Sequence, residues 1–291
     1  MILFADSGSS KCDWVIYDNI TNELSRTRTK GLNPNILKGK KIADLIRNNN
    51  ELFAIRNIVE KVYFYGAGCG TIKNQEKVAE ILNLTFQNAI TINVKEDLMA
   101  AVLATTNEPA IICILGTGSN CCYYDGENIQ TKTPSLGYVL MDEASGNYFG
   151  KELLRSYYYN QLPNELRVSL EQSYKLNPQK VLDKIYNSKY PNKYLANFAR
   201  FLIYNIEHPY IVSMIRNGIN AFIENHIMPY ANEYKNVPIH FVGSIAYHTQ
   251  KIINEELEKF GLSANSFVRR PVENLIDNML QLENTIIEKS K

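Results

Sequence analysis

The chain has 291 residues, of which 31 are Lys or Arg and 30 are Asp or Glu, so its formal net charge is +1. This balance creates no general attraction to nucleic acid or to an anionic membrane, and we expect neither as a partner. The five cysteines are an odd number without a C-x-x-C pair, which argues against a disulfide framework or a zinc site.

The length of the chain suits two medium-sized domains better than one. Its N-terminal apolar stretch ends at Asp6, too early for the core of a signal peptide. No later apolar run approaches the length of a membrane span. We therefore expect a cytoplasmic protein.

The first third of the chain alternates strand-like and helix-like patterns. We expect strands at 2–6, 12–17, 23–30, 61–65 and 90–94, and helices at 37–48, 74–83 and 97–105. This α/β segment ends at Pro109, which marks a domain boundary. The first lobe is thus predicted to span residues 1–109.

The second lobe, predicted at 110–271, begins with the same succession of strands. We expect strands at 110–115, 119–124, 129–133 and 237–242, a helical insertion at about 150–230, and helices at 245–260 and from Pro271 onward. The last helix, 272–291, is expected to join the first lobe. The repetition indicates that the two lobes share one ancestral unit.

Two short glycine-containing loops connect strands at equivalent places in the two lobes. The first is Asp6-Ser7-Gly8-Ser9-Ser10-Lys11, and the second is Leu115-Gly116-Thr117-Gly118-Ser119-Asn120. Glycine lets backbone N–H groups approach an anion, and the hydroxyl side chains add donors. Either loop alone is adequately explained as an ordinary hairpin turn, but the pair favours nucleotide phosphate binding.

A third junction, Gly243-Ser244, lies between a strand and a helix, where an anion or nucleotide can bind. Neither the Walker pattern nor the dinucleotide fingerprint is present, since strands follow both glycine loops.

These residues resemble the actin-like ATPase superfamily, which includes sugar kinases and the heat-shock chaperone ATPase. More narrowly, the chain is similar to the BadF/BadG/BcrA/BcrD-type ATPases, the family that contains N-acetylglucosamine kinase. The resemblance rests on the two loops, on Val242-Gly243-Ser244, and on Glu96-Asp97-Leu98-Met99-Ala100-Ala101. The segment Gly137–Gly150, with its Asp142-Glu143-Ala144-Ser145-Gly146 core, is similar to the acetylamino-sugar kinase branch.

The resemblance implies an α/β fold with two actin-like, ribonuclease H-like lobes around an ATP cleft. It implies ATP- and Mg²⁺-dependent phosphorylation of an amino-sugar hydroxyl, with N-acetylglucosamine converted to its 6-phosphate. The chain departs from the family pattern at Ser7, where many relatives have glycine, and at Glu96, where an Asn often precedes the interlobe Asp.

Each part of phosphoryl transfer then has a candidate residue. Asp97 is expected to be the general base and Asp6 the Mg²⁺ ligand. The residues expected to bind ATP are Ser7, Gly8, Ser9, Ser10, Lys11, Gly116, Thr117, Gly118, Gly243 and Ser244. The residues expected to bind the sugar are Asn35, Thr117, Asn120, Asp142 and Glu143.

Structural roles are alternative explanations for some of these residues. Asp97 is compatible with a helix N-cap, Asp6 with a turn, and Lys11 with a solvated strand residue. Asp142 or Glu143 is compatible with a cap on the helix that follows. The four histidines share no metal-ligand spacing and receive no role.

Two other functions remain as alternatives. One is an ATPase that activates a partner redox enzyme, such as 2-hydroxyacyl-CoA dehydratase or benzoyl-CoA reductase, through an iron–sulfur cluster shared across a dimer. The other is a nonenzymatic sugar or nucleotide sensor. A homodimer is compatible with the apolar surface of the helical insertion.

Overall fold

The computed structural model describes residues 1–8, 11–269 and 278. Two compact units are present: unit 1, which includes Met1–Ala104, and unit 2, Thr105–Arg270. Ser9, Ser10 and the expected helix at 272–291 lie outside the described residues, apart from Asn278. The side-chain amide of Asn278 donates a hydrogen bond to the carbonyl of Leu103 in unit 1 (2.7 Å).

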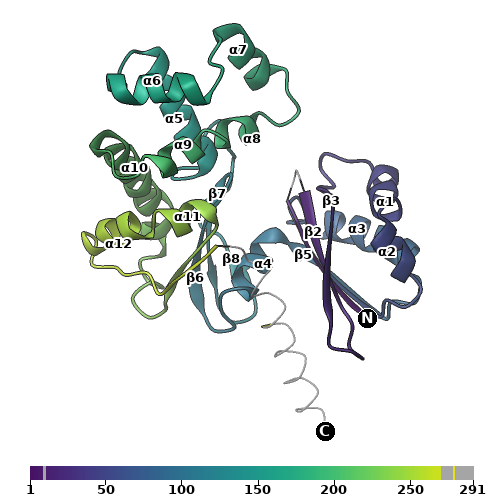
Figure 1. Ribbon diagram of the computed structural model, residues 1–291. Helices are drawn as coiled ribbons and strands as arrows, with labels where there is room; N and C mark the ends of the chain where they lie inside the picture. Colours follow the sequence, from purple (N-terminus) through teal and green to yellow (C-terminus); the bar gives the residue numbers. More distant parts are fainter. Residues whose placement is uncertain (9–10, 270–277, 279–291) are drawn as a thin grey trace. The chain divides into compact units, whose positions relative to one another are not determined.

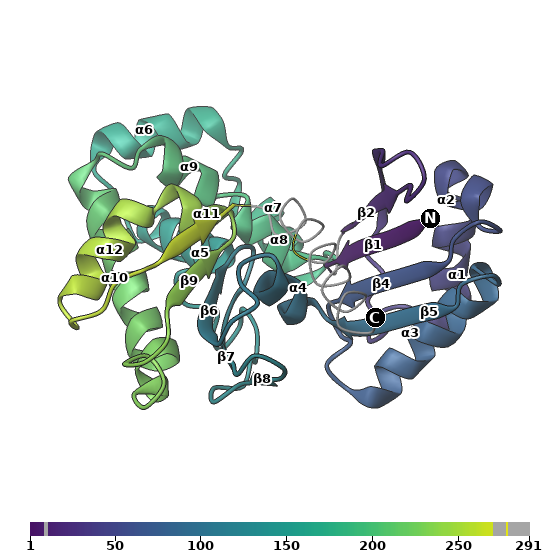
Figure 2. The same ribbon diagram turned by 90° about the horizontal axis from the view of Figure 1, so that it is seen from below.

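Unit 1 contains a five-stranded mixed sheet with the order β3-β2-β1-β4-β5 (Figures 1 and 2). Its strands are β1 (Ile2–Ser7), β2 (Lys11–Tyr17), β3 (Leu24–Lys30), β4 (Lys61–Gly66) and β5 (Thr91–Glu96). The first three strands form an antiparallel meander, whereas β1, β4 and β5 are parallel. The carboxyl ends of the three parallel strands therefore lie at one edge of the sheet.

Helices cover both faces of this sheet. They are α1 (Gly39–Arg47), α2 (Asn50–Ile55), α3 (Ile72–Thr85) and α4 (Asp97–Leu103). Leu3 and Ala5 pack in the core that includes residues of α1, α2 and α3, whereas Ile2 and Phe4 pack in the core that includes residues of α4. Because β1 is buried on both faces, its sequence is a continuous apolar run rather than an alternating one.

Unit 2 contains a second five-stranded mixed sheet, with the order β10-β9-β6-β7-β8. Its strands are β6 (Ala110–Leu115), β7 (Ser119–Tyr124), β8 (Ile129–Gln130), β9 (Ile239–Val242) and β10 (Ser266–Val268). The first three strands are antiparallel neighbours, and β6, β9 and β10 are parallel, as in unit 1. The expectation of an α/β fold with two related lobes is confirmed.

The long connection between β8 and β9 is mainly helical, as expected. Unit 2 has the helices α5 (Gly146–Tyr158), α6 (Asn164–Ser173), α7 (Pro178–Tyr186), α8 (Pro191–Ala196), α9 (Ala199–Tyr204), α10 (Pro209–Phe222), the π-helix η1 (Ile223–Ile227), the 3₁₀-helix η2 (Met228–Tyr230), α11 (Ser244–His248) and α12 (Gln250–Glu258). Many of them contribute to one apolar core with β6, β7 and β9. No helix in the described part of the chain is long and apolar enough to cross a membrane.

Several local predictions were wrong. Helix α2 was not predicted; its N-cap is Asn49, which accepts a hydrogen bond from Leu52 N. Strand β10 was not predicted either, because its three half-buried residues show no recognisable alternation. The helix expected at 245–260 is two helices, because the backbone of Thr249 leaves the helical region (φ −108°, ψ 12°). The strand expected at 129–133 contains only Ile129 and Gln130.

The contact between α5 and α8 yields a test of the unit 2 core. A Cβ atom on Gly150 of α5 would lie 1.9 Å from the carbonyl oxygen of Leu195 in α8. We expect Gly150→Ala to lower the free energy of unfolding by about 2–3 kcal/mol, because the backbones must move apart. Chemical denaturation followed by circular dichroism measures this change.

Gly39→Ala is the matched control, since its Cβ would meet Ile81 Cδ1 at an ordinary 3.4 Å. That variant should be as stable as the parent chain or slightly more stable. An equal loss of stability in both variants would contradict the close packing of α5 on α8.

Candidate functional site

Polar residues gather where the parallel strands of unit 1 end. Ser7 of β1 is paired with Gly66 of β4, and Gly66 is paired with Glu96 of β5, so the three strand ends are level. Asp6 lies one residue before this row, and Asp97 opens α4 directly after it. Ligands commonly bind outside the carboxyl ends of parallel strands, which is where these carboxyl groups lie.

Both aspartates are held in an environment that disfavours their charged forms. Burial raises the pKa of Asp97 to about 7, and the negative charges of Glu96 and Asp6 add to the increase. Burial likewise raises the pKa of Asp6 to about 6, although the positive charge of Lys11 opposes the change. Carboxyl groups with such pKa values can gain or lose a proton near neutral pH, as a general base must.

Asp97 is not the N-cap of α4. That position belongs to Glu96, whose side chain makes no capping hydrogen bond. Asp97 is the first residue of the helix, so its carboxyl group lies at the positive end of the helix. The structural role that the sequence left open for Asp97 therefore does not explain its position.

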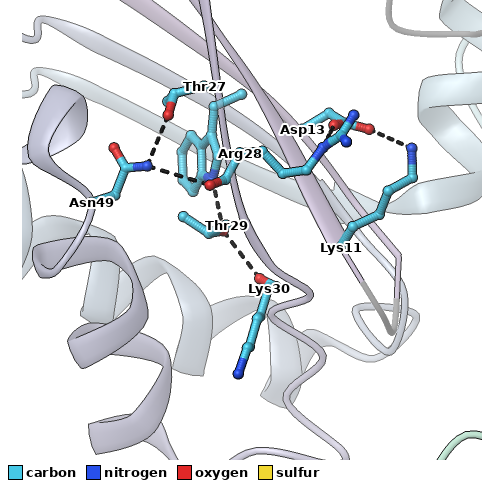
Figure 3. Close-up of polar contacts among 8 residues, drawn as sticks. Lys11, Asp13, Thr27, Arg28, Thr29, Lys30 and Asn49 are labelled. Carbon is cyan, nitrogen blue, oxygen red and sulfur yellow. Dashed lines mark hydrogen bonds and ion pairs between the residues drawn. The ribbon is translucent and has the colours of Figure 1, made fainter.

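Lys11, at the start of β2, forms an ion pair with Asp13. The Lys11 Nζ atom lies 2.6 Å from one carboxylate oxygen of Asp13, and Arg28 Nε of β3 lies 2.5 Å from the other. Figure 3 shows Asp13 between these two cations. Burial by itself would raise the pKa of Asp13, but the hydrogen bonds and charges of Lys11 and Arg28 outweigh it and lower the pKa. Asp13 was not among the site residues predicted from the sequence.

The fully buried Ser7 joins β1 to the loop that holds Asn35. Its Oγ atom accepts a hydrogen bond from Leu32 N (2.9 Å), so this hydroxyl group is engaged inside unit 1. Among the described residues, the nearest atom to a Cβ added on the neighbouring Gly8 would be Lys11 O, at an ordinary contact distance of 3.8 Å.

The amide group of Asn35 is oriented by Asn74 of α3. Asn74 Nδ2 donates to Asn35 Oδ1 and to the carbonyl of Gly68, both at 2.8 Å. The Asn35 side chain is exposed, and its Nδ2 group can still donate to a ligand. Asn74 was not predicted, because nothing in the local pattern connects α3 to residue 35.

In unit 2, the glycine loop between β6 and β7 is held by the segment before α5. Gly146 N donates to Gly116 O (2.8 Å), and Asn147 N donates to Thr117 O (3.0 Å). Thr117 itself is exposed, and Asn120 bonds through Oδ1 to Cys121 N (2.9 Å). The backbone of the loop is therefore fixed by hydrogen bonds while its tip remains accessible.

Asp142 is part of this loop structure. Its carboxylate accepts hydrogen bonds from Ser119 N (3.3 Å) and from Asn147 Nδ2 (2.7 Å), and the residue is buried. Neither Asp142 nor Glu143 caps α5, because Ser145 occupies the N-cap and accepts from Tyr148 N. Ser145 and Asn147 are thus further members of the site that sequence reasoning did not select.

Glu143 is paired with a buried histidine. Its Oε2 atom lies 3.0 Å from Nε2 of His226, which belongs to η1. No role was predicted for His226, because 83 positions separate it from Glu143 and only the fold brings the two residues together.

Gly243 connects β9 to α11 beside the same loop. Its φ angle is +115°, and a Cβ atom there would lie 2.4 Å from Leu115 O. Only glycine fits this position without displacing the end of β6. Ser244, the first residue of α11, is exposed.

The carboxylate of Asp6 is a suitable ligand for Mg²⁺. No group of three or more His, Cys, Asp or Glu side chains that could hold a metal ion occurs among the residues that the structure describes. Mg²⁺, however, is usually held by one or two carboxylates together with water and substrate phosphates, and Asp6 provides such a carboxylate.

Comparison with known structures defines the class of protein. The chain is 32% identical to the putative N-acetylglucosamine kinase from Porphyromonas gingivalis, with a TM-score of 0.89, and the match covers 96% of this chain and 98% of the other. A putative N-acetylglucosamine kinase from Chromobacterium violaceum is 12% identical, with a TM-score of 0.71, over 95% of this chain and 98% of the other.

A ROK family glucokinase from Streptomyces griseus, solved in complex with glucose and AMPPNP, is 12% identical with a TM-score of 0.59, over 92% and 93% of the two chains. At this identity, the second and third structures share the fold. No protein-family model and no curated protein matches the sequence.

The architecture is therefore that of the actin-like sugar kinases. The chain belongs to the family of the P. gingivalis protein, within this class.

The raised pKa of Asp97 has a measurable consequence for stability. The folded chain binds the proton of this carboxyl group more tightly than the unfolded chain, so stability falls as pH rises from about 4 to about 7 and stays low above that. We expect Asp97→Asn to raise the free energy of unfolding by about 1–2 kcal/mol at about pH 8, and this gain to shrink at lower pH. Urea denaturation across this pH range measures it.

Asp13→Asn is the control with the opposite sign. The pKa of Asp13 is lowered, so its carboxylate stabilises the fold above its ordinary pKa and loses this effect as pH falls. Asp13→Asn should therefore be destabilised at about pH 8. Destabilisation of both variants there would contradict the environment described for Asp97.

Proposed function

We propose that the chain phosphorylates a hydroxyl group of an amino sugar with ATP and Mg²⁺, and that the substrate is N-acetylglucosamine, phosphorylated at C6. The observation that carries this proposal is the pair of carboxyl groups with raised pKa, Asp6 and Asp97, at the strand ends of an actin-like sheet. The identity of 32% to a putative N-acetylglucosamine kinase supports the choice of sugar. We also propose that the family is of the BadF/BadG type.

In this proposal Asp97 accepts the proton of the attacking sugar hydroxyl. Its raised pKa makes the carboxylate a stronger base than an ordinary aspartate, while a large share of the molecules remains ionised near neutral pH. Asn35, oriented by Asn74, donates a hydrogen bond to the sugar from its amide. Asn120, Thr117, Asp142 and Glu143 are the proposed sugar-binding residues of unit 2.

The nucleotide is proposed to bind through backbone amides of the glycine-containing loops, the side chain of Lys11 and a Mg²⁺ ion. In unit 2, Gly116–Gly118 and Gly243-Ser244 are the candidate contacts to phosphate and adenosine. In unit 1, Gly8 and Lys11 are the candidates, together with Ser7, Ser9 and Ser10 from the first loop. Asp6 would hold Mg²⁺, which neutralises charge on phosphate oxygens when bound.

The iron–sulfur alternative conflicts with the position of the cysteines. A cluster shared between two chains needs thiolates at the surface. All five cysteines are buried: Cys12, Cys69, Cys113, Cys121 and Cys122. Burial raises the pKa of Cys69, which lies between Gly68 and Gly70, to about 12, and this opposes thiolate formation.

A sensor that only binds a sugar has no evident need for two carboxyl groups with raised pKa, which cost folding stability. The cost is easier to explain if the proton affinity of Asp97 serves a chemical step.

The test is ADP formation from ATP and Mg²⁺ with N-acetylglucosamine, N-acetylmuramic acid, glucosamine and glucose in turn. We expect N-acetylglucosamine to give the highest kcat/KM. Asp97→Asn should lower kcat by about 10²- to 10⁴-fold, because the general base is lost. Product analysis by NMR identifies the phosphorylated position.

Glu96→Gln is the matched control, since Glu96 is the adjacent carboxyl group at the same strand end. It should retain most of the activity. A loss confined to Glu96→Gln would assign the base to Glu96 instead, and ADP formation that is independent of sugar would contradict the kinase proposal.

A further inference from the structure

We infer that His226 is a positioning residue for sugar binding, and that it acts by fixing the carboxylate of Glu143. This inference rests on the proposed function and assigns a role to a residue that lies outside every motif of the sequence. The link is the 3.0 Å contact between His226 Nε2 and Glu143 Oε2.

His226 is enclosed by its neighbours. Only 4% of its surface is exposed, and its ring stacks on Phe222 with 4.9 Å between ring centres and 20° between planes. Its backbone lies in η1, a π-helical turn that follows α10 directly. Next to it, the carbonyl of Asn225 accepts a hydrogen bond from Thr133 Oγ1 (3.1 Å). π-Helical turns are rare and occur frequently at functional sites.

The hydrogen bonding of the ring indicates which nitrogen carries the proton. His226 Nδ1 is buried and has no hydrogen-bond partner. A proton on Nδ1 would be an unsatisfied buried donor, whereas an unprotonated Nδ1 leaves only an acceptor unpaired. We therefore assign the proton to Nε2, which donates it to the carboxylate of Glu143.

The backbone on both sides of Glu143 is unusual. Asp142 and Ala144 have φ angles of +71° and +58°, in the left-handed region. This turn directs two adjacent acidic side chains to different partners: Asp142 contacts Ser119 N and Asn147, while Glu143 contacts His226. Left-handed conformations in residues other than glycine cost energy and cluster at ligand-binding sites.

The arrangement leaves one oxygen of Glu143 for a ligand. Both oxygens of Asp142 already accept hydrogen bonds, whereas Glu143 uses Oε2 for His226 and its side chain is 20% exposed. Because Oε2 is anchored, Oε1 can accept a hydrogen bond from a sugar hydroxyl without first losing the rotational freedom of the side chain.

His226→Phe tests the inference, because it removes the Nε2 donor and keeps an aromatic ring against Phe222. We expect the KM for the sugar to rise about 10-fold, the upper end of the effect expected when a side chain has to be immobilised on binding instead of beforehand. The KM for ATP and kcat should change less than about 2-fold by the same reasoning, since no reacting atom is touched. His226→Gln, which retains an amide donor, should restore most of the sugar affinity.

A double-mutant comparison separates positioning from general structural support. If His226 acts through Glu143, then His226→Phe should have no further effect on sugar KM in a Glu143→Ala background. An equal rise in KM in both backgrounds would overturn the inference, as would a rise that His226→Gln does not reverse.

His208→Phe is the matched control. His208 also lies 3.0 Å from a glutamate, Glu165, but at the other end of α10. His208→Phe should leave the sugar KM unchanged. Calorimetric titration of the wild-type protein with the sugar, done in parallel, distinguishes two failures. A wild-type protein that is inactive and binds no sugar refutes the proposed function. An active wild-type protein whose sugar KM is unchanged by His226→Phe refutes only the role of His226.

Discussion

The parallel pairing of β1, β4 and β5 is the constraint on which the unit 1 site depends. It places three strand ends in one row, beside the largely buried strands β1 and β4. Two carboxyl groups placed there, Asp6 and Asp97, become weak acids through desolvation. The same pairing that builds the core therefore also sets the proton affinity of the site.

The second sheet repeats the strand order of the first, and in each sheet a glycine-containing loop joins the first two strands. The surroundings of the two loops differ: in unit 1 the carboxyl groups of Asp6 and Asp97 have raised pKa values, whereas in unit 2 the carbonyls of the loop accept hydrogen bonds from Gly146 N and Asn147 N. One topology thus supports two kinds of binding surface, since the sheet determines where a site lies and the side chains determine its chemistry.

The sequence predicted most of the strands and the two glycine loops because these features are local. The apolar runs 2–6 and 110–115 and the turns that follow them can be read without knowledge of distant residues. Short elements with weak patterns, α2 and β10, were missed. The partners that orient the site were also missed, because Asn74, Asn147 and His226 act through contacts that only the folded chain creates. The roles of the predicted site residues in catalysis and binding stay predictions.

The two hydrogen bonds of Asn74 have a consequence for protein engineering. This one side chain connects Asn35 to the backbone of Gly68, so both loops are held by the same residue of α3. If the loop at residue 35 alone were exchanged between related proteins, it would no longer be matched to the residue that holds it in place. To alter which ligand this lobe recognises by exchanging segments between related proteins, segments 31–35 and 66–74 therefore have to be exchanged together.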